Sequence, residues 1–245
     1  MSHLAVEGAV AASTQNQALA AALFLYRHVL GVSLPWLDGL VRAKRSVHVP
    51  VVLSRDEVAA VLHQLVGAQW LMVALLYGCG FRLLECLQLR VKDVDFSQCE
   101  ITVRAGKGDR DRRTMLPAAL RIPLEGQIAA VRRLHGRDLS SGAGWVELPR
   151  ALSRKYPTAG RTLGWQWVFP AVRGYVEPES GQRRRHHYHE SALQRVVKTA
   201  LVRAGLVKPA GCHTFRHSFA THLLEDGHDI RTVRSCSGTE TSAPP

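Results

Sequence analysis

An apolar run in the first third of the chain places the strongest constraint on its fold. Residues 69–79 are almost entirely apolar, which predicts a buried helix, and the run is too short to cross a bilayer. Arg82 follows this run within three residues. A guanidinium next to a buried helix is unfavourable unless an anion meets it. That anion is either Glu85 or Asp93 in a structural ion pair, or the negative charge of a ligand.

A second basic site falls on residues 212–230. Apolar residues recur there at helical spacing, namely Phe215, Phe219 and Leu223, with Ala220 and Leu224 beside them. Gly227 is placed to end this helix. His213 and Arg216 are three residues apart at its start, so their side chains can converge on one point. Free N–H groups and the helix dipole favour an anion at that position, and the guanidinium fork matches two phosphate oxygens.

The residue types at the start of this helix also allow two simpler interpretations. One is an amphipathic core helix whose basic residues are incidental. The other is a metal site, since His213 and His217 are four residues apart. No His-Glu-x-x-His pattern is present and no carboxylate joins the pair, so we expect no metal and no other cofactor.

A β-hairpin is predicted in the middle of the chain. Residues 100–104 alternate as a strand does, residues 106–109 form a turn, and residues 112–116 return. The turn places Lys107 at the tip. A lysine at a hairpin tip is usually only solvated. A phosphate-binding P-loop is excluded because Gly-Lys is not followed by Ser or Thr and the context is not strand–loop–helix.

The other segments predict helices. Ser54 and Glu57 form a capping-box pattern before a helical apolar stripe. Further helices are expected over residues 118–136 and 189–204, and over 1–30, where Ser13 or Thr14 is the expected cap and Gly31 the stop. The apolar stripe of the first helix is Leu19, Leu23, Tyr26 and Leu30. The predicted fold is therefore mainly α with a small antiparallel β-sheet, an α+β architecture.

Residues 140–188 combine aromatic and basic side chains. Their candidate DNA contacts are Trp165, Trp167, Arg184, Arg185, His186 and His187. Aromatic rings interleaved with cations suit stacking on bases together with phosphate contact. The alternative is that both tryptophans are core residues.

The charge balance favours a polyanionic partner. The formal net charge is +12 with a pI of about 10.1, which indicates nucleic acid first and a membrane surface second. A basic soluble protein with no such partner remains an alternative. Five scattered cysteines without a Cys-x-x-Cys pair indicate a reducing cytoplasm, and neither a signal peptide nor a membrane span is evident.

Three motifs together resemble the tyrosine site-specific recombinases, the phage integrase family. His213-Thr-Phe-Arg216-His-Ser-Phe-Ala-Thr-His resembles the family's His-x-x-Arg box. Tyr-Gly-Cys-Gly-Phe-Arg82-Leu-Leu-Glu-Cys is similar to its first conserved box, and Gly-Lys107-Gly-x-x-x-Arg112 to its catalytic hairpin. The resemblance implies that Arg82 and Arg216 bind phosphate, that Lys107 protonates the leaving oxygen, and that His213 acts as a base or hydrogen-bond partner.

In this family a tyrosine attacks the scissile phosphate and no metal takes part. The family's second-box His and its Tyr have no counterpart here, because all five tyrosines precede the His213 box: Tyr26, Tyr77, Tyr156, Tyr175 and Tyr188. We therefore expect this chain to be cleavage-dead. A non-catalytic DNA-binding remnant and an active recombinase remain two hypotheses, and an RNA-binding module, suggested by charge and aromatics alone, is a third.

The segment Leu-Pro-x-Ala-Leu-x-Arg-Lys-Tyr-Pro with Gly-Trp165-x-Trp167-Val-Phe-Pro and Arg184-Arg185-His186-His187 resembles the extra segment of integron integrases. The resemblance implies recombination of gene cassettes in a bacterial cytoplasm. The implied partner is DNA, as folded single-stranded cassette sites and a duplex attachment site, with homo-oligomers assembled on it.

The expected domain organisation follows from the same resemblance. Residues 1–30 are a remnant of a helical core-binding domain and 31–50 a basic linker. Residues 51–233 are the catalytic domain with an insertion at about 140–188, and 234–245 are a frameshifted, disordered tail. The linker contributes Arg42, Lys44 and Arg45, and the hairpin Arg110 and Arg112, as further DNA contacts. A solvated linker is the alternative.

Overall fold

The computed structural model describes residues 7–8, 10–32, 43–44, 49–104, 111–149 and 152–228. The chain divides into two compact units, residues 1–49 and residues 50–245. Helices predominate and the strands form small antiparallel sheets, so the predicted fold class is confirmed. No helix within the described ranges has the length and apolarity needed to cross a membrane.

The described part of the first unit, residues 1–49, contains one long helix. α2 spans Ala12–Phe24 and continues into a π-helical turn, η1, at Leu25–Val29. The predicted side-chain caps are wrong, because the helix starts after Ala11 and no side chain caps it. The predicted stop is confirmed, since Gly31 has φ +64. Leu19 is buried, whereas the rest of the predicted stripe is half-buried or exposed.

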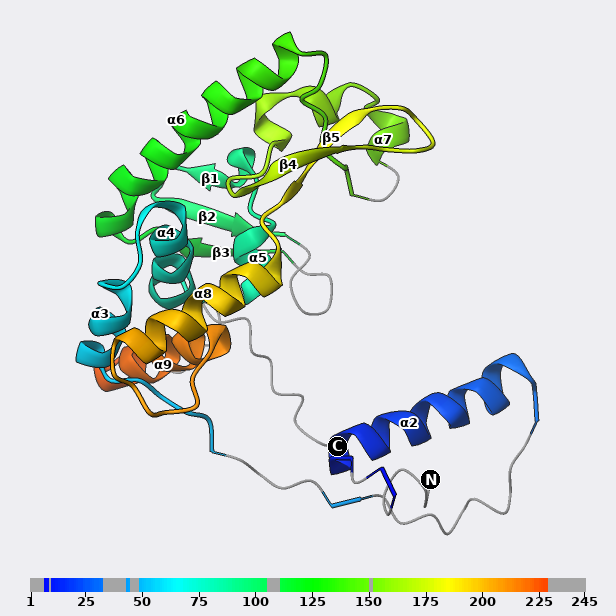
Figure 1. Ribbon diagram of the computed structural model, residues 1–245, viewed down its shortest axis with the longest axis vertical. Coiled ribbons are helices and arrows are strands. Elements are labelled where there is room, and N and C mark those ends of the chain that lie inside the picture. The colour runs from blue at the N-terminus through cyan, green and yellow to red at the C-terminus, as the bar shows by residue number, and fades with distance from the viewer. Residues whose placement is uncertain are drawn as a thin grey trace. The chain divides into compact units, whose positions relative to one another are not determined.

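The second unit holds the remaining elements (Figure 1). Its helices are α3 Arg55–Leu62, α4 Gly67–Gly78, α5 Leu83–Leu87, η3 Val91–Asp93, α6 Ala118–Ser140, α7 Leu152–Lys155, η4 Ala159–Arg161, η5 Leu163–Trp165, α8 Glu190–Arg203 and α9 Cys212–Glu225. Its strands are β1 Val94–Asp95, β2 Glu100–Val103, β3 Arg112–Met115, β4 Pro170–Val176 and β5 Arg183–His187.

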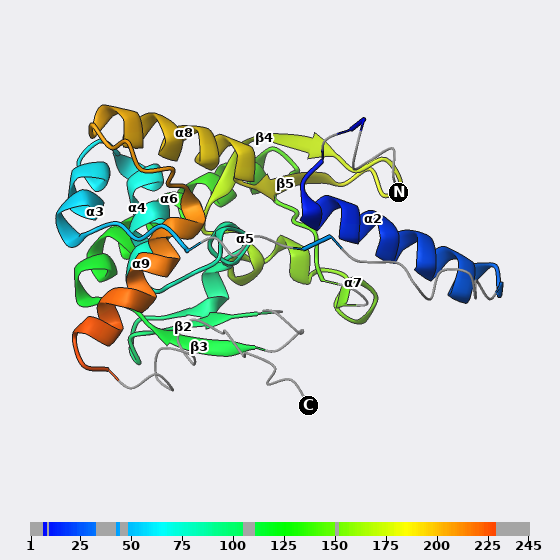
Figure 2. The same ribbon diagram turned by 90° about the horizontal axis from the view of Figure 1, so that it is seen from below.

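The core is built around the apolar run. α4 carries that run and buries all of residues 71–76, as predicted. α3, α6, α8 and α9 all pack against α4, and Figure 2 shows α3, α4, α8 and α9 gathered at one side of the unit. Since α8 and α9 come more than a hundred residues after α4, burial of this helix brings Arg82, just after α4, close to the start of α9.

Each of the two sheets is antiparallel. β1, β2 and β3 form one sheet, in which Val103 pairs with Arg112 and Glu100 with Met115, so the predicted hairpin is confirmed. β4 and β5 form the second sheet. Figure 1 shows this second hairpin and α7 together near the C-terminal end of α6.

Candidate phosphate-binding site

One carboxylate, that of Glu85, is shared by three guanidinium groups. Arg82 Nη1 donates to its Oε1 at 2.6 Å and Arg112 Nη2 to its Oε2 at 2.9 Å. Arg216 Nη1 lies 3.7 Å from the same Oε2. The Glu85 side chain is only 8% exposed. Three segments distant in sequence are thereby held at one point, and positive charge exceeds negative charge among these four side chains.

The surroundings shift the ionisation of this cluster. Burial alone raises the pKa of Glu85, but the backbone N–H of Arg82 and the charge of Arg112 outweigh it, so the pKa falls below its usual 4.5. Burial, reinforced by repulsion from Arg82, lowers the pKa of Arg216 to about 10. Glu85 is therefore ionised and Arg216 cationic at neutral pH, and the cluster suits a dianion or a phosphodiester.

Arg216 is buried on α9 and faces the loop after α4. Its Nη1 donates to the carbonyl of Gly80. Its Nη2 is buried and has no hydrogen-bond partner among the described residues. A buried guanidinium N–H without a protein acceptor is costly unless a ligand supplies one. This buried N–H, in the cluster around Glu85, is therefore a candidate donor to an oxygen of a bound anion.

Gly80 allows the loop after α4 to approach α9 closely. Its φ is +60, and a Cβ at this position would lie 2.5 Å from the ring of Phe219. Only glycine accommodates both the left-handed backbone and this close approach. The loop that carries Arg82 can therefore reach the helix that carries Arg216.

His213 lies at the exposed start of α9. The helix begins at Cys212, and the hydroxyl of Thr214 accepts the N–H of Gly211 at 3.0 Å. His213 and Arg82 line one cleft of about 740 Å³. Burial, together with the nearby His213 and Arg216, lowers the pKa of His217 one turn further on. The structure thus brings the predicted residues Arg82, His213 and Arg216 into one region.

The aromatic segment, residues 140–188, forms another wall of this cleft. Arg90 joins it to the conserved motif that contains Arg82. Trp165 and Trp167 both line the cleft. Arg90 is buried and donates to the carbonyls of Trp165 at 2.7 Å and Glu147 at 2.9 Å. Its guanidinium lies 3.7 Å from the centroid of the Trp167 ring. This arrangement anchors the 140–188 segment next to the arginine cluster around Glu85.

The structure favours the core alternative for part of the aromatic set. Trp167 is 7% exposed and its Nε1 donates to the carbonyl of Arg185 at 3.2 Å. His187 is equally buried, and burial lowers its pKa. Trp165 is half-buried, with the Lys92 amine 2.9 Å from its ring centroid. His186 is exposed, so it and part of Trp165 are the aromatic groups accessible from this set.

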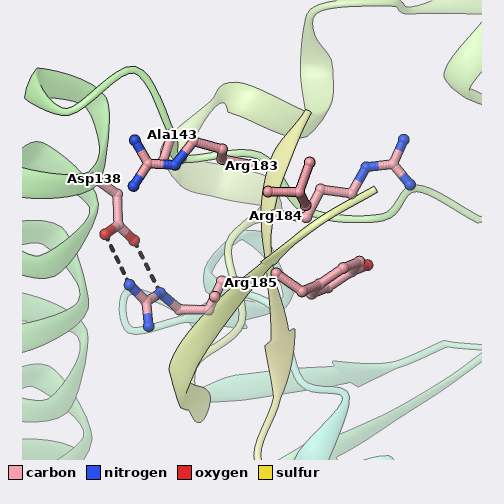
Figure 3. Close-up of a pocket in the computed structure, with 9 residues that line it drawn as sticks. Asp138, Ala143, Arg183, Arg184 and Arg185 are labelled. Carbon is pink, nitrogen blue, oxygen red and sulfur yellow. Dashed lines mark hydrogen bonds and ion pairs between the residues drawn. The ribbon is translucent and has the colours of Figure 1, made fainter. Parts of the chain in front are cut away.

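The predicted DNA contacts among the arginines also bond to the protein itself. Arg184 donates to Gln182 Oε1 through Nε at 3.0 Å and Nη2 at 2.8 Å. Arg185 forms a two-bond ion pair with Asp138 (Figure 3). Arg112, predicted as a DNA contact, is 12% exposed and pairs with Glu85. Arg185 and Arg112 therefore have structural roles that their sequence context did not indicate.

Several predicted residues lie outside the described ranges. These are Arg42, Arg45, Lys107 and Arg110, together with the predicted tail, residues 234–245. Lys44 is described and exposed, in the unit formed by residues 1–49. No tyrosine is among the described residues that line the cleft. Tyr77 instead shares a 2.8 Å hydrogen bond with Nδ1 of His222.

Sequence reasoning missed two residues that organise this region, Arg90 and Asp138. Arg90 lies between Leu89 and Val91, and a charge flanked by apolar residues was the available signal for burial. No spacing rule pairs Arg112 with Glu85 or Asp138 with Arg185, because each pair joins different elements.

Comparison with known families identifies the family of the chain. The model of the phage integrase family matches residues 51–242, and that of the phage integrase N-terminal SAM-like domain matches residues 1–36. The chain belongs to the phage integrase family. The family match runs beyond Val233, where the resemblance in sequence motifs ends.

The chain is similar to particular members of this family. It is 48% identical over 238 residues to an integrase/recombinase of Escherichia coli and to one of Pseudomonas aeruginosa, covering 97% of this chain and 71% of each relative. The crystal structure of XerA recombinase aligns with a TM-score of 0.56 and 25% identity, over 98% of this chain and 71% of that one. XerH bound to its difH substrate aligns at 0.57 with 20% identity, over 97% and 62%, which supports the fold alone.

Proposed function

We propose that this chain binds DNA by holding one phosphodiester against Arg82 and Arg216, as the phosphate-binding part of a site-specific tyrosine recombinase. The observation that carries the proposal is the convergence of three arginines on Glu85 with one buried N–H of Arg216 left without a protein acceptor among the described residues. Family membership supplies the reaction class, and a protein of similar fold, XerH, was solved bound to its difH substrate.

The cluster suits the charge distribution of phosphoryl transfer. Arg82 and Arg216 would stabilise the nonbridging oxygens, whose negative charge grows in the transition state. His213, exposed at the α9 start in the same cleft as Arg82, would hydrogen-bond the phosphate or accept a proton. Lys107 lies in the connection between β2 and β3 and would protonate the leaving oxygen. Glu85 would orient the arginines without touching DNA.

We further infer that the 245-residue chain binds this phosphate without forming a covalent link. Covalent transfer needs a tyrosine that attacks phosphorus. All five tyrosines precede the His213 box, and Tyr77 is bonded to His222. A non-cleaving DNA-binding protein is therefore the form of the function that this chain's own residues support.

The DNA preferred by the chain is inferred to be a folded single strand with unpaired bases, as in integron cassette sites. The support is the 140–188 segment, which lies against the phosphate cluster and presents Trp165 and exposed His186. Unpaired bases stack on such groups, whereas duplex bases are inaccessible to them.

Titration of the chain into labelled DNA tests the binding proposal. A hairpin with extrahelical bases, a matched duplex and a single-stranded RNA of the same sequence are compared at several salt concentrations. We expect tighter binding to the bulged hairpin and a steep loss of affinity with salt, because phosphate contacts release counterions. Absence of binding to both DNAs at low salt contradicts the proposal, and preference for RNA replaces it with an RNA-binding function.

Matched variants assign the phosphate contact. Arg216→Gln is expected to weaken binding to both DNAs by about tenfold, because a charged, buried donor is lost. Arg121→Gln is the control, since Arg121 is an exposed arginine on α6 paired with Glu125. Equal losses of DNA affinity in the two variants would show that binding depends only on the net charge of the chain.

A nicked suicide substrate tests the absence of cleavage. Incubation followed by denaturing electrophoresis is expected to show no protein–DNA adduct from this chain. An adduct refutes the non-cleaving assignment. One base inserted at the Arg234 codon tests the frameshift hypothesis, which expects an adduct only from the shifted frame.

A further inference from the structure

The β4–β5 hairpin needs support from outside its own strands. It has two strands, and such a hairpin is marginal in water by itself. Its register shifts between Pro170 and Gly174, so residues 171–173 of β4 lie opposite His186 alone on β5. Carbonyls within an irregularity of this kind leave the ladder and must find other donors.

Arg185 supplies those donors and ties the hairpin to α6. Its Nη1 donates to the carbonyls of Ala171 at 2.9 Å and Val172 at 2.6 Å, both inside the irregularity. Its Nε and Nη2 donate to the two carboxylate oxygens of Asp138 at 2.9 and 2.8 Å (Figure 3). Side chains of both partners are less than a fifth exposed, at 14% and 17%. This two-bond geometry fixes orientation as well as distance.

The backbone of the same residue holds two further segments. The N–H of Arg185 donates to the carbonyl of Trp145 at 2.9 Å. Its carbonyl accepts the indole N–H of Trp167 at 3.2 Å. Arg185 therefore joins the hairpin, the end of α6, the loop after α6 and the aromatic wall of the cleft.

The hairpin is not closely packed on every side of this ion pair. A hollow of about 260 Å³ lies beside the pair and is lined by Gly144, Gly174 and Tyr175 as well as by Asp138 and Arg185. Since space remains next to the ion pair, loss of the pair leaves the hairpin room to shift.

We propose that Asp138 and Arg185 are positioning residues, which lock the β4–β5 hairpin so that His186 and Trp165 are presented together to an unpaired base. This inference rests on the proposed DNA-binding function. Asp138 lies on α6 and acts through Arg185, so it affects which DNA is bound without a contact to DNA. Arg185 is thereby assigned to the hairpin's geometry and not to a phosphate.

Asp138→Asn is the primary test, because it removes the charge while keeping the shape. The ratio of affinities for bulged hairpin DNA over duplex is expected to fall on the order of fivefold, with duplex affinity changed less than about twofold. Hydrogen exchange of amides 174–176 and 183–185 is expected to accelerate. Arg185→Lys keeps a positive charge but lacks the fork, so it is expected to reproduce both effects, and the double variant to be no worse than either.

Glu125→Gln is the matched control, since it removes a carboxylate from the same helix at an exposed pair. It is expected to leave the affinity ratio and the hairpin's exchange unchanged. Should Asp138→Asn fail to fold, Arg185→Lys carries the test. Unchanged exchange in the hairpin, or equal loss on both DNAs, overturns the proposal. Failure of the unmodified chain to bind either DNA refutes the proposed function instead, and the exchange measurement then still decides the positioning role.

Discussion

At the scale of single residues, the candidate site depends on residues whose role is to position the arginine side chains. Glu85 accepts bonds from Arg82 and Arg112 and lies 3.7 Å from Arg216, so one carboxylate sets the spacing of three cations. Gly80 supplies the carbonyl that Arg216 binds. Neither residue is expected to touch DNA, and a change at either is expected to move the arginines proposed to do so.

Glu85→Gln is expected to destabilise the fold by about 3 kcal/mol at neutral pH, because arginines are left without their carboxylate. The pKa of Glu85 is below 4.5 in the folded state, so its contribution is complete above pH 4.5 and is lost as pH falls through the lowered value. Urea denaturation of both proteins across this range should show the difference shrinking with acidity. A difference that is constant with pH contradicts an ionised Glu85.

Gly80→Ala is expected to cost about 3 kcal/mol or more, because strain at φ +60 adds to a clash with Phe219. Gly67 is a matched control, with φ +57 and no atom within 4 Å of the position that a Cβ would take. Gly67→Ala therefore reports strain alone, about 1 kcal/mol. If the two variants lose similar free energies of unfolding in urea denaturation, the close approach of Phe219 does not add to the cost at Gly80.

At the scale of elements, one buried arginine joins the end of α5 to the aromatic segment. Arg90 donates to two carbonyls and lies over the Trp167 ring. The N–H of Val91 also donates to the carbonyl of Gln166 at 3.0 Å, and that of Val168 to the carbonyl of Leu89 at 2.8 Å. The aromatic segment is thus held against the candidate phosphate-binding site and lines the same cleft as Arg82 and His213.

Arg90→Lys is expected to lower the free energy of unfolding by about 2 kcal/mol, because a buried carbonyl loses its donor. Exchange of amides over residues 145–168 should accelerate at the same time. Arg113→Lys serves as the control, since its side chain is 75% exposed and its pair with Glu100 is on the surface. If Arg113→Lys has an equal effect, the role assigned to Arg90 is wrong.

At the scale of the whole molecule, the second unit has a large apolar core formed by its own described residues. The buried apolar cluster draws its residues from Leu53 to Phe215. We therefore expect a chain of residues 50–245 to melt within about 2 °C of the 245-residue chain by calorimetry. A markedly lower midpoint would show that residues 1–49 contribute to the stability of the second unit.

Local patterns determined much of this protein from the sequence alone. The apolar run predicted α4, the Ser54–Glu57 pattern predicted the start of α3, and alternation predicted the β2–β3 hairpin. These features depend on neighbours within a few residues, where periodicity and capping act. The family motifs also named Arg82, His213 and Arg216 before their positions were known.

The tertiary structure alone decided which side chains meet. The approach of Arg112 and Arg216 to Glu85 and the pairing of Asp138 with Arg185 join residues from 27 to 131 positions apart in the chain. Local periodicity cannot predict contacts between residues so far apart in the chain, because these contacts form only when α4 is buried between α6, α8 and α9. For the same reason, basic and aromatic residues that look alike in the sequence differ in the fold: some are candidates for a phosphate contact, and others are parts of the frame that positions those candidates.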